Sequence, residues 1–162
     1  MNETLHYFKS TPVNIVGNNK LRTPQIEAYI NIKEYFQQNP TGEALVVLPT
    51  GTGKSGLISI APFDVSDGRV LIITPGLITR DSIKKTQDAL QDNFWINHDI
   101  IFSIDNLPVL VEYESDVSDE HLKQSHIIFS NIQLPLRTRA CINPGNGLVV
   151  KQNRNQHEKV RR

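Results

Sequence analysis

ALVVLPTGTGKS spans residues 44–55, and this stretch decides the fold. Its first five residues are apolar and predict a buried strand. A glycine-rich turn follows, where backbone N–H groups around Gly51 and Gly53 can converge on a polyphosphate because no side chains obstruct them. Lys54 supplies a positive charge for the terminal phosphates, and the Ser55 hydroxyl can ligate Mg2+. The stretch therefore predicts a strand, a phosphate-binding loop and a helix.

The generic phosphate-loop pattern, Walker A, requires glycine at the position where this chain has Leu48. The heptapeptide PTGTGKS instead resembles the first motif of superfamily 2 helicases and translocases, of the DEAD/DEAH-box and restriction-subunit types. The resemblance implies a RecA-like P-loop NTPase sandwich with a mostly parallel sheet, binding ATP and Mg2+. The loop residues that would bind the nucleotide are Pro49, Thr50, Gly51, Thr52, Gly53, Lys54 and Ser55, with Ser55 as the metal ligand.

Length and composition predict one soluble domain. The 162 residues can enclose an ordinary core, although only 38% of them are hydrophobic. A single cysteine, Cys141, excludes an internal disulfide and favours a reducing compartment. No apolar run reaches the length of a membrane span, and the N-terminal residues lack a signal-peptide pattern. We therefore expect a cytoplasmic protein without membrane contact.

The zero net charge conceals two oppositely charged parts. Residues 1–136 carry 10 Lys/Arg and 16 Asp/Glu, a net charge of −6. Residues 137–162 carry 7 Lys/Arg and one Glu, a net charge of +6. The first part is expected to be a partial RecA-like lobe and the second a basic tail. Two interpretations of the tail stay open, namely a solvated or disordered terminus and a segment that contacts nucleic-acid phosphates.

Apolar runs alternate with helical patterns along the chain. Helices are expected at residues 23–38, 54–61 and 77–90, and strands at residues 44–48, 70–73, 99–104 and 126–129. The acidic stretch 112–120 has helix or loop character. Strands that are apolar almost throughout favour a parallel sheet covered on both faces, with ligands beyond the carboxyl ends of its strands.

A second stretch supports the resemblance. LRTPQ, residues 21–25, resembles the glutamine motif that precedes the phosphate loop in superfamily 2 proteins. The resemblance makes Gln25 a reader of the adenine edge, because an amide both donates and accepts hydrogen bonds. Arg22 would assist near the base. The alternative is that Gln25 is an ordinary exposed helix residue.

Two later segments resemble the motifs that hold the nucleic-acid backbone in this superfamily. Thr74 and Arg80 follow the second expected strand, and Ser130 and Gln133 follow the fourth. Hydroxyl, amide and guanidinium groups suit phosphate contact, which positions nucleic acid without reading its sequence. We expect DNA rather than RNA as the partner. The alternative for the first segment is a plain turn between strand and helix.

The acidic motif of the superfamily is missing. There, the strand after the Ser130 segment ends in Asp-Glu-x-x, whose Asp holds Mg2+ and whose Glu positions the attacking water. Nothing after Gln133 matches it, and the second helicase lobe, which a second polypeptide could carry, is absent too. Asp105 ends an apolar run and is a candidate substitute for that Asp. The resemblance thus implies a truncated lobe with no catalytic residue, which binds nucleotide and hydrolyses it weakly or not at all.

Two other functions are compatible with the sequence. One is a small P-loop nucleotide phosphotransferase, although such enzymes usually retain the first glycine of the loop and lack a glutamine motif. The other is a non-catalytic module that binds nucleotide or nucleic acid and acts by docking to partners.

Overall fold

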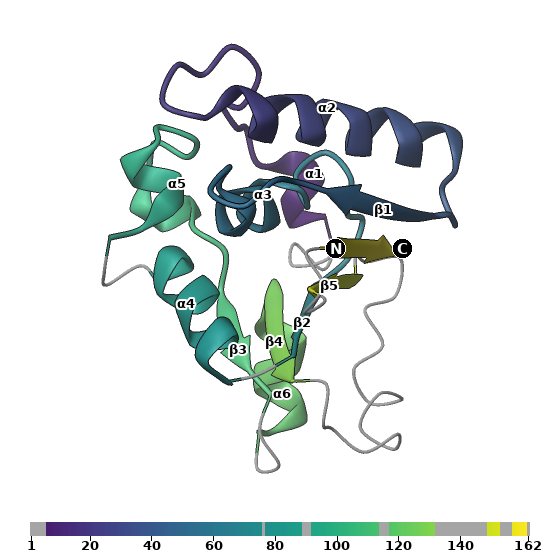
Figure 1. The fold of residues 1–162 in the computed structure, drawn as a ribbon. Coiled ribbons are helices and arrows are strands. Elements are labelled where there is room, and N and C mark those ends of the chain that lie inside the picture. Colours follow the sequence, from purple (N-terminus) through teal and green to yellow (C-terminus); the bar gives the residue numbers. More distant parts are fainter. Residues whose placement is uncertain are drawn as a thin grey trace.

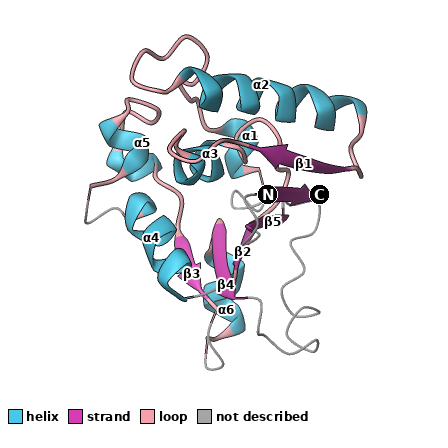
Figure 2. Ribbon diagram, viewed as in Figure 1, coloured by secondary structure: helices cyan, strands magenta, loops and turns pink. Residues whose placement is uncertain are grey.

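The computed structural model describes residues 6–75, 77–88, 92–113, 117–131, 149–152 and 157–161. The helices are α1 (Tyr7–Ser10), α2 (Thr23–Gln38), α3 (Lys54–Ile60), α4 (Leu77–Gln87), α5 (Phe94–Asn97) and α6 (Asp119–Gln124), with a short 3-10 turn, η2 (Ile104–Asn106). The strands are β1 (Glu43–Val47), β2 (Val70–Thr74), β3 (Leu110–Glu112), β4 (Ile127–Asn131), β5 (Val149–Gln152) and β6 (His157–Arg161). Figures 1 and 2 show helices gathered around the sheet, with α2 lying across α3 and β1.

The strands form one sheet in the order β1-β6-β5-β2-β4-β3. β6 runs antiparallel to both of its neighbours, whereas β5, β2, β4 and β3 pair in parallel. Since two antiparallel pairings restore the original direction, β1 points the same way as β2. Five of the six strands therefore share one direction. The predicted α/β fold with a mostly parallel sheet is confirmed, and it agrees with a partial RecA-like domain.

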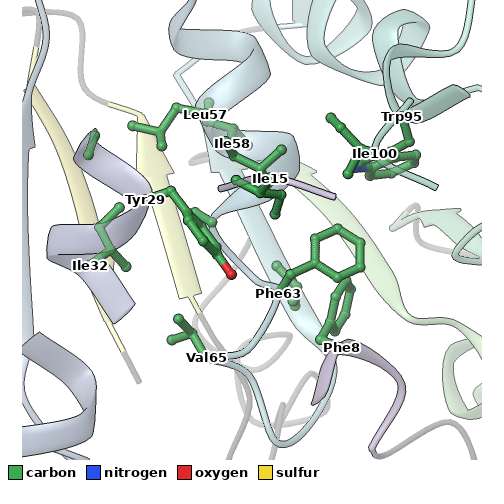
Figure 3. Packing of buried hydrophobic residues seen from close by; sticks show 14 of the residues in the cluster. Phe8, Ile15, Tyr29, Ile32, Leu57, Ile58, Phe63, Val65, Trp95 and Ile100 are labelled. Carbon is green, nitrogen blue, oxygen red and sulfur yellow. The ribbon is translucent and has the colours of Figure 1, made fainter. Parts of the chain in front are cut away.

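Side chains from α1 to α5 pack against one face of the sheet. This main core includes Tyr29 of α2, Leu57 of α3 and Trp95 of α5, all almost fully buried. The rings of Phe8 and Phe63 meet nearby with centroids 5.2 Å apart (Figure 3). A smaller cluster around Leu71, Leu122 and Ile128 brings α6 to the opposite face.

A polar cluster joins α2 to the segment after α3. Asp64 accepts hydrogen bonds from the Tyr29 hydroxyl at 2.6 Å and from the Lys33 ammonium at 2.8 Å. Asp64 has a φ of 62°, a left-handed conformation in which Asp and Asn are better tolerated than most residues. These contacts join α2, which precedes the phosphate loop, to the segment that follows α3.

The prediction of a strand at residues 99–104 is wrong. This segment is a turn after α5, in which the N–H groups of Ile100 and Ile101 both donate to the Trp95 carbonyl. Ile100 and Ile101 are buried, but Phe102 is 77% exposed, so burial does not continue along the apolar run. An apolar run reports burial, and a turn packed on the core satisfies that as well as a strand does. The edge strand is β3 instead, which ends at the first residue of the expected acidic stretch.

The burial expected of the first strand is also only half right. In β1, Ala44 and Val46 pack on the main core, whereas Leu45 and Val47 are 55% and 57% exposed on the other face. β1 lies at the end of the strand order, so β6 is its one pairing partner within the described chain. β5 and β6 both belong to residues 137–162, which the sequence presented as a basic tail.

No helix in the described part of the chain has the length and apolarity that a membrane crossing needs.

Candidate phosphate-binding site

The phosphate loop connects the carboxyl end of β1 to the first residue of α3. Gly51 and Gly53 have φ angles of 84° and 89°, and Gly53 is the residue immediately before the helix. A side chain at either position would place its Cβ close to the following carbonyl oxygen, so glycine is favoured there. These two left-handed residues give the loop the curvature that the sequence predicted.

Three donors of the loop converge on one oxygen atom. The Pro49 carbonyl accepts hydrogen bonds from the Thr52 hydroxyl at 2.7 Å, the Lys54 ammonium at 3.2 Å and the Thr52 N–H at 3.4 Å. The Lys54 side chain is therefore folded over its own loop. A phosphate oxygen entering the loop would compete with this carbonyl for the same donors, because a charged acceptor makes the stronger hydrogen bonds.

Gln25 and Arg22 approach the loop from the start of α2. Gln25 is 3% exposed, its Nε2 donates to the Gly53 carbonyl at 2.8 Å, and its Oε1 accepts the Arg22 N–H at 3.0 Å. The Arg22 guanidinium donates to the Gly51 carbonyl. The structure thus brings both predicted residues to the loop, but Gln25 is not an exposed helix residue and its amide is bonded within the protein.

Sequence reasoning missed two further residues beside this loop, Gly56 of α3 and Phe94 of α5. A Cβ at Gly56 would lie 2.6 Å from Cζ of Phe94 and even closer to the Gln25 amide. Such separations are shorter than any carbon contact in a folded protein, so only glycine lets Gln25 and Phe94 reach α3 together. The signal available in the sequence was the glycine itself, within the first turn of an expected helix.

The comparison with protein families agrees with this geometry. The family model described as "Type III restriction enzyme, res subunit" matches residues 18–160. The chain belongs to this family. Comparisons with curated proteins and with solved structures found no match. The match begins just before Arg22 and extends into β6, so it covers the phosphate loop together with most of the basic segment.

Members of this restriction-subunit family are helicase-like and carry an ATP-binding domain, which generally works with ATP and Mg2+. The loop of this chain offers a suitable donor set for the phosphates, namely backbone N–H groups and the Lys54 ammonium. A serine hydroxyl can ligate Mg2+, and Ser55 lies in the first turn of α3, directly after Lys54. In the parts of the chain that the structure describes, no three His, Cys, Asp or Glu side chains gather as a metal cluster.

The residues predicted to contact nucleic acid are not gathered into one exposed surface. Thr74 is the last residue of β2 and Ser130 the last but one of β4, at the same edge of the sheet as the loop, but they are 0% and 3% exposed. Two strands lie between β1 and β2 in the sheet, so β2 is about 14 Å from β1 and its loop. Gln133 lies outside the described residues.

Arg80, the fourth of these residues, is bound to an acidic partner. Its guanidinium forms an ion pair with Glu112 of β3, and Lys84 pairs with the same carboxylate at 2.7 Å. The Arg80 side chain is 12% exposed and that of Glu112 is 18% exposed. A nucleic-acid phosphate that contacts Arg80 must therefore compete with Glu112.

None of the strands that the structure describes ends in an Asp-Glu pair. β5 is the described strand that follows β4 in the chain, it lies parallel to β2, and its last residues are Lys151 and Gln152. Asp105, the substitute considered from the sequence, lies in the η2 turn rather than at a strand end, and its N–H donates to the Ser103 hydroxyl. The turn explains why the apolar run before Asp105 does not present that carboxylate to the loop edge.

Proposed function

We propose that this chain is the nucleotide-binding lobe of a helicase-like ATPase, which binds ATP with Mg2+ and hydrolyses it weakly by itself. The observation that carries the proposal is the loop from Pro49 to Ser55, with its two left-handed glycines and its converging donors. Backbone N–H groups and Lys54 would hold the β- and γ-phosphates. Ser55 would hold Mg2+, which neutralises charge on the phosphates.

The proposed weak hydrolysis rests on the residues that end β5. Hydrolysis requires a carboxylate to hold the metal ion and another to position the attacking water. β5 ends in Lys151 and Gln152, and neither residue type can do either task. Binding through the loop needs neither carboxylate, so nucleotide binding and hydrolysis separate in this chain.

Nucleic acid and a second polypeptide complete the proposal. Thr74, Arg80, Ser130 and Gln133 would contact the backbone of DNA, in preference to RNA, after Arg80 has left Glu112. A partner that carries the remaining helicase lobe would supply the groups for hydrolysis. The single cysteine and the family's work on nucleic acid favour a cytoplasmic location.

A fluorescent ATP analogue tests the proposal with the full chain. Titration of the wild type should show saturable binding that requires Mg2+, and Lys54→Ala should weaken it by about tenfold or more, since a charged hydrogen bond to phosphate is lost. Lys85→Ala is the matched control, because Lys85 is exposed on α4 and should leave binding unchanged. Equal binding by wild type and Lys54→Ala would refute the site, and rapid Lys54-dependent hydrolysis would refute the second half.

A further inference from the structure

Two carbonyl groups of the phosphate loop are held from outside by the side chains of Arg22, the residue before α2, and Gln25, in the first turn of α2. Gln25 Nε2 donates to the Gly53 carbonyl at 2.8 Å, and the Arg22 guanidinium donates to the Gly51 carbonyl. The Gln25 amide is fixed in turn, because its oxygen accepts the Arg22 N–H at 3.0 Å. The carbonyl groups that accept these hydrogen bonds thus belong to the two left-handed glycines of the loop.

Holding these carbonyls determines where the neighbouring N–H groups point. In a planar trans peptide the C=O of one residue and the N–H of the next point in opposite directions. Hydrogen bonds from α2 to the Gly51 and Gly53 carbonyls therefore turn the N–H groups of Thr52 and Lys54 away from α2. The Thr52 N–H does point inward, toward the Pro49 carbonyl on which the other loop donors converge.

The Gln25 amide is committed to this task. It is 3% exposed, and it fits so closely between Gly53 and Gly56 that a Cβ on either glycine would overlap it. The amide has a second N–H and a second oxygen lone pair, but a nucleobase could reach them only after the amide left its buried place between Gly53 and Gly56, which would break both of its present bonds. A buried amide that loses its partners costs about 1–3 kcal/mol, and the loop would lose its support at the same time.

We infer that Gln25 positions the loop instead of reading the base, and that the site recognises the triphosphate group of its ligand. The ligand class is then any nucleoside triphosphate, together with inorganic tripolyphosphate, and adenine is not selected. The inference rests on the proposed function, because it concerns the ligand of the same loop.

Competition against the fluorescent ATP analogue tests this inference with the full chain in the presence of Mg2+. The competitors are ATP, GTP and inorganic tripolyphosphate. We expect the wild type to bind ATP and GTP with dissociation constants within about threefold of each other, since the same phosphate donors hold both. Tripolyphosphate should displace the analogue completely.

The Gln25→Ala variant separates positioning from base reading. It keeps a strong helix former in α2 and removes both amide bonds, and it should weaken ATP, GTP and tripolyphosphate by one common factor of about five to ten. Gln25→Glu should behave in the same way, because a carboxylate can accept the Arg22 N–H but cannot donate to Gly53. Gln38→Ala, exposed at the end of α2, is the matched control and should leave all three affinities unchanged.

Stoichiometry excludes simple unfolding as the cause, because unfolding reduces the number of sites whereas loop positioning changes the dissociation constant at one site per chain. Binding of ATP at least tenfold tighter than GTP in the wild type would overturn the inference, whether or not Gln25→Ala removes that preference. A variant that weakens ATP alone would also overturn it. Failure of all three competitors and of the analogue itself would instead remove the proposed function, and the inference with it.

Discussion

His126 makes the stability of this protein depend on pH in a predictable way. The residue lies immediately before β4, where its Nδ1 accepts the Val109 N–H at 2.8 Å and its ring packs on Tyr7 with centroids 4.1 Å apart. Burial lowers the pKa of His126 from 6.5 to about 4. A proton on Nδ1 would also replace the acceptor that Val109 needs, so the folded state favours the neutral ring.

The sign of the effect follows from this lowered pKa. As the pH falls below 6.5, the unfolded chain takes up a proton at His126 and the folded chain does not, so folding loses stability until the pH reaches about 4. Complete separation of the two pKa values would be worth about 3.4 kcal/mol. Because the ring is only half-buried, screening by solvent reduces the expected loss to about 1–2 kcal/mol.

Urea unfolding near pH 7.5 and near pH 5 measures this loss against a variant that cannot titrate. In His126→Asn the amide oxygen can still accept the Val109 N–H, so the variant should fold and should lose about 1 kcal/mol less than the wild type between the two pH values. His121→Asn, at an exposed position of α6, should keep the pH dependence of the wild type. Equal losses in the wild type and His126→Asn would refute the assignment to His126.

Three further predictions concern other contacts. Trp95→Phe removes the indole N–H that donates to the Ser59 carbonyl at 2.8 Å and leaves a small void, so urea unfolding should show a loss of about 2–4 kcal/mol, and a loss near zero would contradict the contact. Glu112→Gln should release Arg80 and raise affinity for duplex DNA about twofold to fivefold at low salt, a gain that fluorescence anisotropy should see vanish as salt increases. Burial alone would raise the pKa of the Asp64 carboxyl, but hydrogen bonds from its lysine and tyrosine partners lower it. Asp64→Asn should therefore cost about 1 kcal/mol at neutral pH, and this cost should shrink as the pH falls below about 4; a cost that persists in acid would contradict the ionic contribution.

The sequence predicts an element correctly where its apolar pattern is bounded by glycine, proline or a capping residue. α2 begins at Thr23-Pro24, and β2 is an apolar run between a glycine turn and a proline. The strand prediction at residues 99–104 failed because the two buried isoleucines there belong to a turn whose N–H groups donate to the Trp95 carbonyl. β3 escaped prediction because it is three residues long and only partly buried, so its alternation is too short to register.

The candidate site was predictable where one residue acts through its own backbone or side chain. Gly51, Gly53 and Lys54 belong to this kind, and their geometry follows from the motif. The hydrogen bond from Gln25 to the Gly53 carbonyl did not follow from the motif, since it depends on how α2 lies over the loop. The pairing of Arg80 with Glu112 joins residues from α4 and β3, which no local pattern connects.

The pairing of β6 with β1 changes how the basic segment relates to the phosphate loop. β1 is held by the main core beneath it, through Ala44 and Val46, and by β6 beside it. In the described chain, the hydrogen-bonded route from the loop strand to β2 and β4 passes through β6 and then β5. The seven Lys/Arg of residues 137–162 therefore include residues of the sheet that connects the loop to Thr74 and Ser130. Their charge alone had led us to expect a basic tail. A sheet strand must satisfy backbone pairing first, and its composition follows from the neighbours and solvent on each face, so a basic, Asn-rich segment is compatible with a position inside a sheet.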